Sequence, residues 1–254
     1  MKQWIRGILV FVWTAAAAWT VFAQTRPAVR EVIDRIDKLY RADSSYALME
    51  MQIVTSHWQR TLRLRAWSEG TEKTFIRILE PAKERGTATL RIGSEMWNYL
   101  PKTDKVIRIP PSMMMSSWMG SDFTNNDLVK EFSFTEDYEF QYTSVQDPEQ
   151  GELYIKCIPK PGRPIVWGWV VLAVDAGSLL PKTEKYYDEK GELMRTMSFG
   201  EVKTFDGRKI PSVMELVSQN KEGQKTVIRY LEAEFNIEVP AGTFTTRNLH
   251  LFRG

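Results

Sequence analysis

Histidines, cysteines and clustered carboxylates are the side chains that most often carry catalysis or hold metals, and this chain offers few of them. It contains two histidines, His57 and His250, and one cysteine, Cys157, among 254 residues. Neither histidine has a metal-ligand spacing, and neither a Gly-x-Ser-x-Gly nucleophile elbow nor a phosphate-binding glycine loop occurs. A Ser/His/Asp triad stays open, because its members meet only in space. We therefore predict no metal site, no cofactor and no enzymatic activity.

Acidic side chains gather in one segment, where Asp122, Asp127 and Glu131 could surround a cation. Thr124, however, precedes Asp127 by three residues, which is the spacing of a capping box at the start of a short helix. The pattern predicts a helix over Asp127–Phe132 and favours a structural role for these residues over catalysis.

The N-terminal residues have the pattern of a secretory signal peptide. Lys2 and Arg6 precede an apolar run over Ile8–Phe22, and small or aliphatic residues lead up to Ala23. We predict cleavage after Ala23, with an uncleaved membrane anchor as the alternative, and a single domain over residues 24–254. The formal net charge of +2 is carried by the signal peptide. The rest is neutral, which argues against nucleic acid as a partner.

After this segment, the periodicity predicts one helix followed by strands. Pro27 begins a helix whose apolar positions recur every three or four residues. From Tyr46 onward the period is two, and about a dozen strand-like runs are separated by turn residues. This spacing favours a single antiparallel sheet that curls or partly closes, with Cys157 as a buried apolar residue. Three runs alternate with charged residues, and we expect them to face one apolar hollow: Ala47, Met49, Met51 and Ile53; Leu62 and Leu64; Ile76 and Ile78.

One segment is unusually apolar for a loop. The prolines at 110 and 111 end a strand, and four methionines and a tryptophan follow within Pro110–Phe123. In one interpretation this loop folds back and plugs the core. In the other it is a pliable lid at the mouth of a hollow, held at its far end by Thr124 and Asp127. We expect the lid.

Several blocks of residues, taken together, resemble one protein family. They are Leu39–Tyr46, Thr61–Trp67, Pro81–Thr87 (Pro-Ala-Lys-Glu-Arg-Gly-Thr), Met96–Pro101 (Met-Trp-Asn-Tyr-Leu-Pro) and Met119–Phe123 (Met-Gly-Ser-Asp-Phe). In this order they are similar to blocks of the LolA-like outer-membrane lipoprotein-sorting proteins. The similarity covers nearly the whole chain that follows the signal peptide.

The resemblance implies a mainly β fold, with a strongly curved antiparallel sheet that forms an unclosed barrel of about eleven strands. An N-terminal helix and short helices would cover an apolar hollow. It further implies a monomeric periplasmic carrier, which binds acyl chains of lipids or lipoproteins and moves them between the envelope membranes. The partners it suggests are an inner-membrane transporter of the ABC or RND type and an outer-membrane acceptor.

A carrier also makes physical sense. Each methylene exposed to water costs about 0.8 kcal/mol, so a chain of about 16 carbons costs roughly 12 kcal/mol to move through the periplasm unassisted. The alternatives are an accessory subunit of an inner-membrane export transporter that carries nothing, and an envelope hydrolase that acts on lipids. The residues expected to contact acyl chains are Met49, Met51, Ile53, Leu62, Leu64, Ile76, Ile78, Trp97, Tyr99, Met113, Met114, Met115, Trp118 and Met119.

Overall fold

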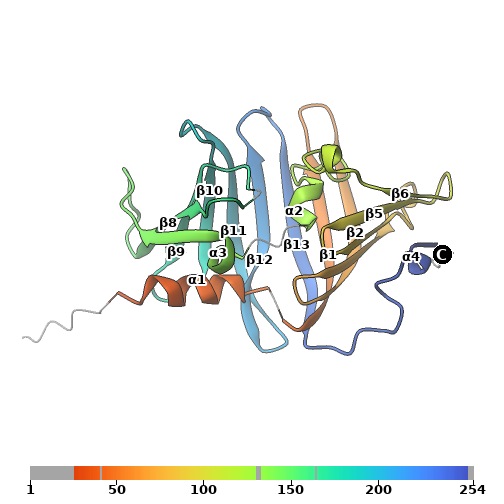
Figure 1. Cartoon of the computed structure of the whole chain (residues 1–254), viewed down its shortest axis with the longest axis horizontal. Coiled ribbons are helices and arrows are strands. Elements are labelled where there is room, and N and C mark those ends of the chain that lie inside the picture. Colours follow the sequence, from red (N-terminus) through yellow and green to blue (C-terminus); the bar gives the residue numbers. More distant parts are fainter. Residues whose placement is uncertain (1–25, 41, 130–132, 164, 251–254) are drawn as a thin grey trace, which may run out of the picture.

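The structure is a computed structural model that describes residues 26–40, 42–129, 133–163 and 165–250. The predicted signal peptide lies outside the described residues. Thirteen antiparallel strands form one unclosed sheet, accompanied by a few short helices (Figure 1). The strands are β1 (Ser44–Val54), β2 (Gln59–Glu69), β3 (Lys73–Glu80), β4 (Ala88–Ile92), β5 (Glu95–Leu100), β6 (Lys105–Arg108), β7 (Tyr138–Tyr142), β8 (Glu152–Pro159), β9 (Trp169–Asp175), β10 (Pro181–Tyr187), β11 (Leu193–Phe205), β12 (Arg208–Ser218) and β13 (Lys225–Phe235). The helices are α1 (Val29–Asp37), the 3₁₀ turn η1 (Pro111–Met113), α2 (Asn125–Val129), α3 (Phe134–Asp137) and α4 (Thr246–His250).

The single antiparallel sheet and its mainly β character confirm the prediction, but the expected number of about eleven strands was too low. The strand that periodicity misses is β4. Its five residues do alternate, with Ala88, Leu90 and Ile92 apolar and Thr89 and Arg91 polar, but the run is short. Four of the five are buried, because the strand is covered on both faces.

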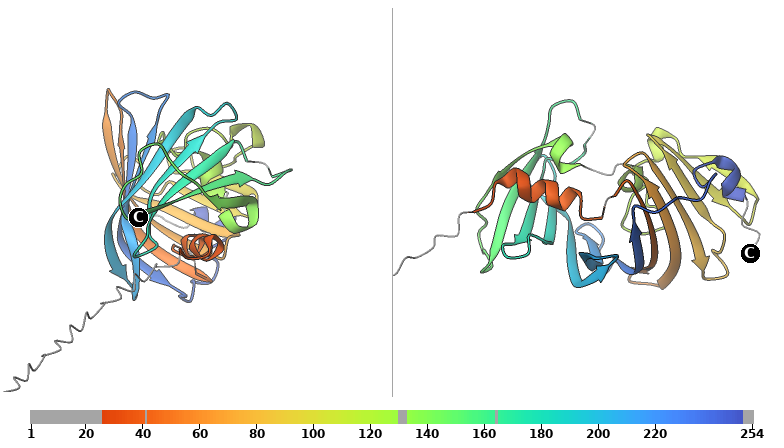
Figure 2. Two further views of the ribbon diagram at one scale, coloured as in Figure 1. Left: turned by 90° about the vertical axis from the view of Figure 1, so that its left-hand side faces the viewer. Right: turned by 90° about the horizontal axis from the view of Figure 1, so that it is seen from below.

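The order of the strands in the sheet shows the path that the chain takes from one edge of the sheet to the other. The order runs β6-β5-β4-β3-β2-β1-β13-β12-β11-β10-β9-β8-β7, so β1 pairs with both β2 and β13 at the centre. The two edges, β6 and β7, are therefore consecutive in the sequence. Residues 109–137 join them, and we call this stretch the crossover segment. Figure 2 shows the sheet bending around the side that carries α1, α2 and α3.

Helix α1 covers one half of this concave face. Its buried residues Val32, Ile33 and Ile36 form a core cluster with Phe134 of α3 and with inward residues of β7, β8, β9 and β10. The apolar stripe predicted for the N-terminal helix is thus the stripe that packs against the sheet. Cys157 of β8 is buried in the same cluster, as predicted, and burial raises the pKa of its thiol.

The other half of the sheet, β1 to β5, is covered on both faces. On the concave face, Met51, Leu62 and Ile78 pack with the crossover segment. On the convex face, Phe75 and Leu90 pack with Leu249 of α4 and with neighbours on β5. Within the part of the chain that the structure describes, no helix is both long and apolar enough to cross a membrane.

Candidate functional site

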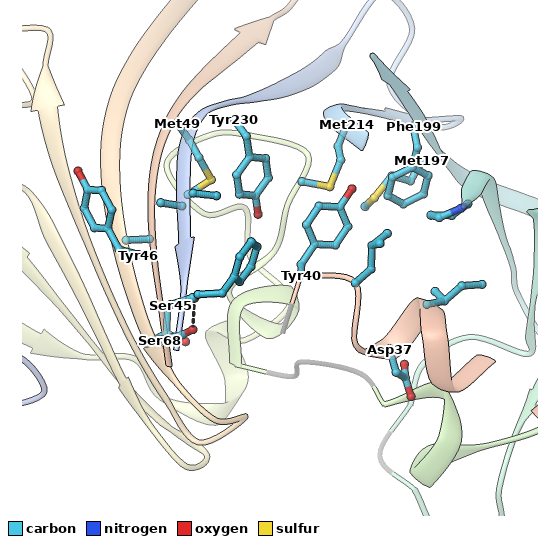
Figure 3. Close-up of a pocket in the computed structure, with 18 of the residues that line it drawn as sticks. Asp37, Tyr40, Ser45, Tyr46, Met49, Ser68, Met197, Phe199, Met214 and Tyr230 are labelled. Carbon is cyan, nitrogen blue, oxygen red and sulfur yellow. Dashed lines mark hydrogen bonds between the residues drawn. The ribbon is translucent and has the colours of Figure 1, made fainter. Parts of the chain in front are cut away.

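A cavity of about 370 Å³ lies on the concave face between α1 and the sheet. Its size falls near the lower end of the range for ligand pockets, about 300–1,000 Å³. Most of the residues that line it are apolar, and they come from both halves of the sheet and from the helices (Figure 3). They are Ile36, Asp37, Leu39, Tyr40, Ser45, Tyr46, Ala47, Met49, Ala66, Trp67, Ser68, Thr74, Ile76, Phe134, Pro181, Glu184, Tyr186, Met197, Phe199, Met214, Tyr230, Ala233 and Phe235. We call this cavity the hollow.

Small side chains on neighbouring strands make room for the hollow. Ala47 on β1 stands opposite Ala66 on β2 and opposite Ala233 on β13. In the next inward row, Ser45 and Ser68 share a hydrogen bond of 2.6 Å between their hydroxyls. Three alanines in register leave a gap over the sheet, because a row of leucines there would fill the same space.

Aromatic and methionine side chains form the walls. Tyr40, which follows α1, stacks on Tyr230 of β13 with ring centroids 5.6 Å apart, and its hydroxyl donates to the Pro211 carbonyl at 2.8 Å. Burial raises the pKa of Tyr40, so its phenol stays neutral. Met197 and Met214 lie beside it (Figure 3). Methionine adapts its shape to an irregular apolar partner, so these walls suit a flexible acyl chain.

Two carboxyl groups face this apolar space, and only one is fully engaged. Asp37 ends α1 and accepts hydrogen bonds from the Phe134 and Thr135 backbone amides and from the Ser133 hydroxyl, at 2.9–3.0 Å. Glu184 on β10 accepts a hydrogen bond from the Tyr186 hydroxyl. Burial raises the pKa of Glu184, which is 7% exposed. Glu184 is therefore the main polar group with spare hydrogen-bonding capacity at the hollow.

A buried ion pair between Arg195 and Asp127 lies beside Glu184 and Tyr186. Arg195 of β11 donates from Nη1 and Nη2 to the two carboxylate oxygens of Asp127, both at 2.9 Å. Its guanidinium also lies over the rings of Trp167 and Tyr186, at 4.5 and 4.3 Å from their centroids. Burial alone would raise the pKa of Asp127, but the Arg195 charge and hydrogen bonds from Arg195 and Thr124 hold it below its usual range.

Asp127 also completes the predicted capping box. Its backbone amide donates to Thr124 Oγ1 at 3.1 Å, and its carboxylate accepts from the Thr124 backbone amide at 2.8 Å. The helix α2 begins at Asn125, two residues earlier than predicted, because the N-cap is Thr124 itself. Residues 130–132 of the predicted helix lie outside the described residues. The predicted structural role of the Thr124–Asp127 pair is confirmed.

The methionine-rich loop is fixed to the concave face at several points. Trp118 is 2% exposed and donates from Nε1 to Thr89 Oγ1 at 3.1 Å. Asp122 is buried and accepts from Thr226 Oγ1 of β13 at 2.8 Å and from Gln224 Nε2 at 3.1 Å. The Arg60 guanidinium donates to the Met119 carbonyl. The loop therefore has a defined path across the concave face between β13 and β4.

Comparisons with known proteins agree with this architecture. A protein-family model described as an uncharacterized protein matches residues 70–250, more than half of the chain. A structure of a putative outer-membrane lipoprotein-sorting protein domain from Vibrio parahaemolyticus is similar, with a TM-score of 0.73 and 23% identity over 87% of this chain and 97% of that one. The chain belongs to the family that this model describes, and it has the fold of that lipoprotein-sorting domain.

Two further structures share this LolA-like fold. A DUF1329 family protein from Desulfovibrio piger has a TM-score of 0.76 and 23% identity, over 87% of this chain and 97% of that one. A LolA superfamily protein from Nitrosomonas europaea has a TM-score of 0.69 and 22% identity, over 86% and 98%. No curated protein sequence matches the chain.

The structure brings together most of the predicted lining residues, but not in one open space. Met49 and Ile76 line the hollow. Seven others lie on the concave face and pack with one another. They are Met51, Ile53, Leu62, Leu64 and Ile78 of the sheet and Met114 and Trp118 of the loop, with Met119 at their margin. The expectation of one continuous hollow is corrected here, because the chain's own loop fills that part of the concave face.

Four predicted residues lie away from both regions. Trp97 and Tyr99 pack on the convex face with Phe75 and Leu249, because the inward residue of β5 is Met96. Met113 and Met115 are 47% and 48% exposed and contribute little to the cluster. The expected lid at the mouth is also corrected, since no residue of 110–123 lines the hollow.

Sequence reasoning missed the residues that come from the C-terminal strands, above all Met214 and Tyr230. The signal for them was alternation in β12 and β13, but nothing in the sequence shows that β13 pairs with β1. Neither histidine lines the hollow, and the described residues hold no group of three His, Cys, Asp or Glu side chains suited to a metal. Asp122 and Asp127 are engaged in separate networks rather than around one cation. The arrangement is suited to binding.

Proposed function

We propose that this LolA-like protein is a periplasmic carrier, which binds an acyl chain of a lipid or lipoprotein in the hollow and moves it between envelope membranes. The observation that carries the proposal is an apolar cavity of about 370 Å³ over a floor of three alanines in register. The predicted signal peptide supports export, and the similarity to a putative lipoprotein-sorting domain supports this kind of cargo. An inner-membrane transporter and an outer-membrane acceptor are the proposed partners, since the cargo must be loaded and released.

The test is to fill the hollow from its floor. Ala47→Phe places a ring into existing space, so it should lower acyl-chain binding by about tenfold or more while unfolding remains unchanged or shifts upward. The matched control is Thr61→Phe, which adds the same ring at an exposed position of β2. Binding is measured by titration with a fluorescent fatty acid and by native mass spectrometry of protein purified from its own envelope.

Two outcomes would refute the proposal, the first for the carrier function and the second for the binding site. Wild-type protein that holds no lipid, yet co-purifies with an inner-membrane transporter, would favour the accessory subunit instead. Equal binding by Ala47→Phe and Thr61→Phe would show that acyl chains bind outside the hollow.

A further inference from the structure

One carboxyl group in the wall of the hollow has an oxygen with no partner in the described part of the chain. Glu184 lies at the middle of β10 and is 7% exposed. It lines the hollow together with Met197, which stands opposite it on β11. Its Oε2 accepts a hydrogen bond from the Tyr186 hydroxyl, whereas no described residue donates to Oε1. This oxygen can therefore accept a hydrogen bond from a molecule in the hollow.

No cationic side chain of the described residues forms an ion pair with this carboxyl. Arg195 acts on Glu184 through its charge, but its Nη1 and Nη2 both donate to Asp127, and its Nε has no hydrogen-bond partner. Asp37, the other carboxyl at the hollow, accepts from the Ser133 hydroxyl and from two backbone amides. The described residues that line the hollow include no lysine, arginine or histidine. The surroundings of Glu184 therefore hold more carboxylates than cations.

A buried negative charge without an ion-pair partner is costly, because water would otherwise solvate it. Burial accordingly raises the pKa of Glu184. An ammonium group in the hollow would offset this cost, because it supplies a positive charge together with hydrogen-bond donors. An apolar side chain at this position could pack among its neighbours without that cost. The carboxyl of Glu184 is therefore better explained by a bound group than by folding.

We propose that the hollow selects an acyl-chain cargo that carries a protonated primary amine, and that Glu184 binds this ammonium group through Oε1. This inference rests on the proposed carrier function and names the polar group of its cargo. The apolar walls and the carboxyl belong to one cavity, so a single amphiphile can contact both. A neutral hydroxyl would gain one hydrogen bond there without the charge, and an anionic group would be repelled by the same carboxylates.

The test compares dodecylamine with dodecanol, which share one alkyl chain, at neutral pH, where the amine is protonated. The variant is Glu184→Gln, which keeps the shape of the side chain and removes its charge. The matched control is Glu189→Gln, which removes an exposed carboxylate outside the hollow. Isothermal titration calorimetry measures binding, and thermal melts verify that both variants are folded.

We expect wild type and Glu189→Gln to bind dodecylamine about tenfold or more tightly than dodecanol, because hydrogen bonds between charged groups are the strong ones. Glu184→Gln should lose this preference and bind dodecanol as wild type does. Equal affinity of wild type for the two amphiphiles, or an unchanged preference in Glu184→Gln, would overturn the ammonium site while leaving the carrier intact. Protein that binds neither amphiphile, nor the fluorescent fatty acid, would overturn the carrier itself.

A primary amine occurs both on an ethanolamine phospholipid and at the amino terminus of a diacylated polypeptide, so two further arms distinguish these sources. One arm offers phosphatidylethanolamine or phosphatidylglycerol with identical acyl chains in neutral vesicles. The other offers a diacylated peptide whose amino terminus is free or acetylated. A preference for the free amine that Glu184→Gln abolishes assigns the site to the source in which it is found. Its absence from both arms would overturn the ammonium site for membrane-derived cargo.

Discussion

The Asp127–Arg195 ion pair connects the crossover segment to β11, near the middle of the sheet. Breaking this pair should therefore lower the free energy of unfolding. Both side chains are nearly buried, at 12% and 7% exposure, and the two hydrogen bonds are bidentate at 2.9 Å. The perturbation is Asp127→Asn, which keeps the shape of the side chain and removes its charge. Arg195 would then be left as a buried cation beside Trp167 and Tyr186.

The expected cost follows from this burial. Removing one partner of a buried ion pair costs about 3–5 kcal/mol, and the stacked aromatic rings, which still stabilise Arg195, place the value near 3 kcal/mol. The matched control is Thr124→Ala, which removes only the side-chain part of the capping box and costs about 1 kcal/mol. In a chain of this size, the corresponding falls in Tm are about 6–12 °C for Asp127→Asn and about 2–4 °C for Thr124→Ala.

The same pair predicts a pH dependence with a defined sign. Because the pKa of Asp127 is lower in the folded protein than in the unfolded chain, its stabilisation is complete above about pH 4 and is lost as the pH falls further. The gap between wild type and Asp127→Asn should therefore narrow in acid. Denaturant unfolding followed by circular dichroism at neutral and acid pH measures both effects. A cost no larger than that of Thr124→Ala, or a gap that stays constant in acid, would refute the reasoning.

Three further variants separate packing from charge. Glu184→Gln should stabilise the protein at neutral pH, because burial raises the pKa of Glu184 and disfavours its charged form. This penalty is absent below about pH 4, where the carboxyl is protonated in both states, and grows as the pH rises, so the gain in thermal melts should grow with pH. Met113→Ser with Met115→Ser should change stability by less than about 0.5 kcal/mol per site, because both side chains are half exposed. Met114→Ser with Met119→Ser should cost about 2–4 kcal/mol in urea unfolding, because these side chains pack under the loop.

The alternation of residues was enough to find the concave face. Met51, Leu62 and Ile78 could be assigned to it because the period of a strand is a local property of the sequence. The capping box at Thr124 could also be predicted from the sequence, since its two partners are three residues apart. The spacing of the strands predicted a sheet that curls or partly closes, and the LolA-like resemblance then implied that the curvature is strong.

What the sequence could not show depends on contacts between distant segments. Tyr99 reads as a lining residue, yet α4, about 150 residues further on, packs against its strand on the convex face. Tyr230 reaches the hollow only because β13 pairs with β1. A residue on the concave face lines the hollow where the loop leaves it uncovered, and it belongs to the core where the loop covers it. The path of the loop is determined by contacts such as the hydrogen bond between Asp122 and Thr226.

The path of that loop should also limit the length of acyl chain that the proposed hollow accepts. Met49 and Ile76 belong both to the lining of the hollow and to the cluster beneath the loop, so they mark the boundary between the two regions. Trp118 of the loop lies at this boundary, because its Nε1 donates to Thr89, which stands opposite Ile76 in the sheet. Trp118→Ala should therefore open the hollow along β3 and β4, whereas Ala47→Phe should close it from the floor. Each methylene that gains a place contributes about 0.8 kcal/mol, or about fourfold in affinity. In titrations with saturated fatty acids of increasing length, affinity should therefore stop rising at a longer chain for Trp118→Ala than for wild type. A plateau at the same length in both proteins would mean that the loop does not bound the acyl-chain site.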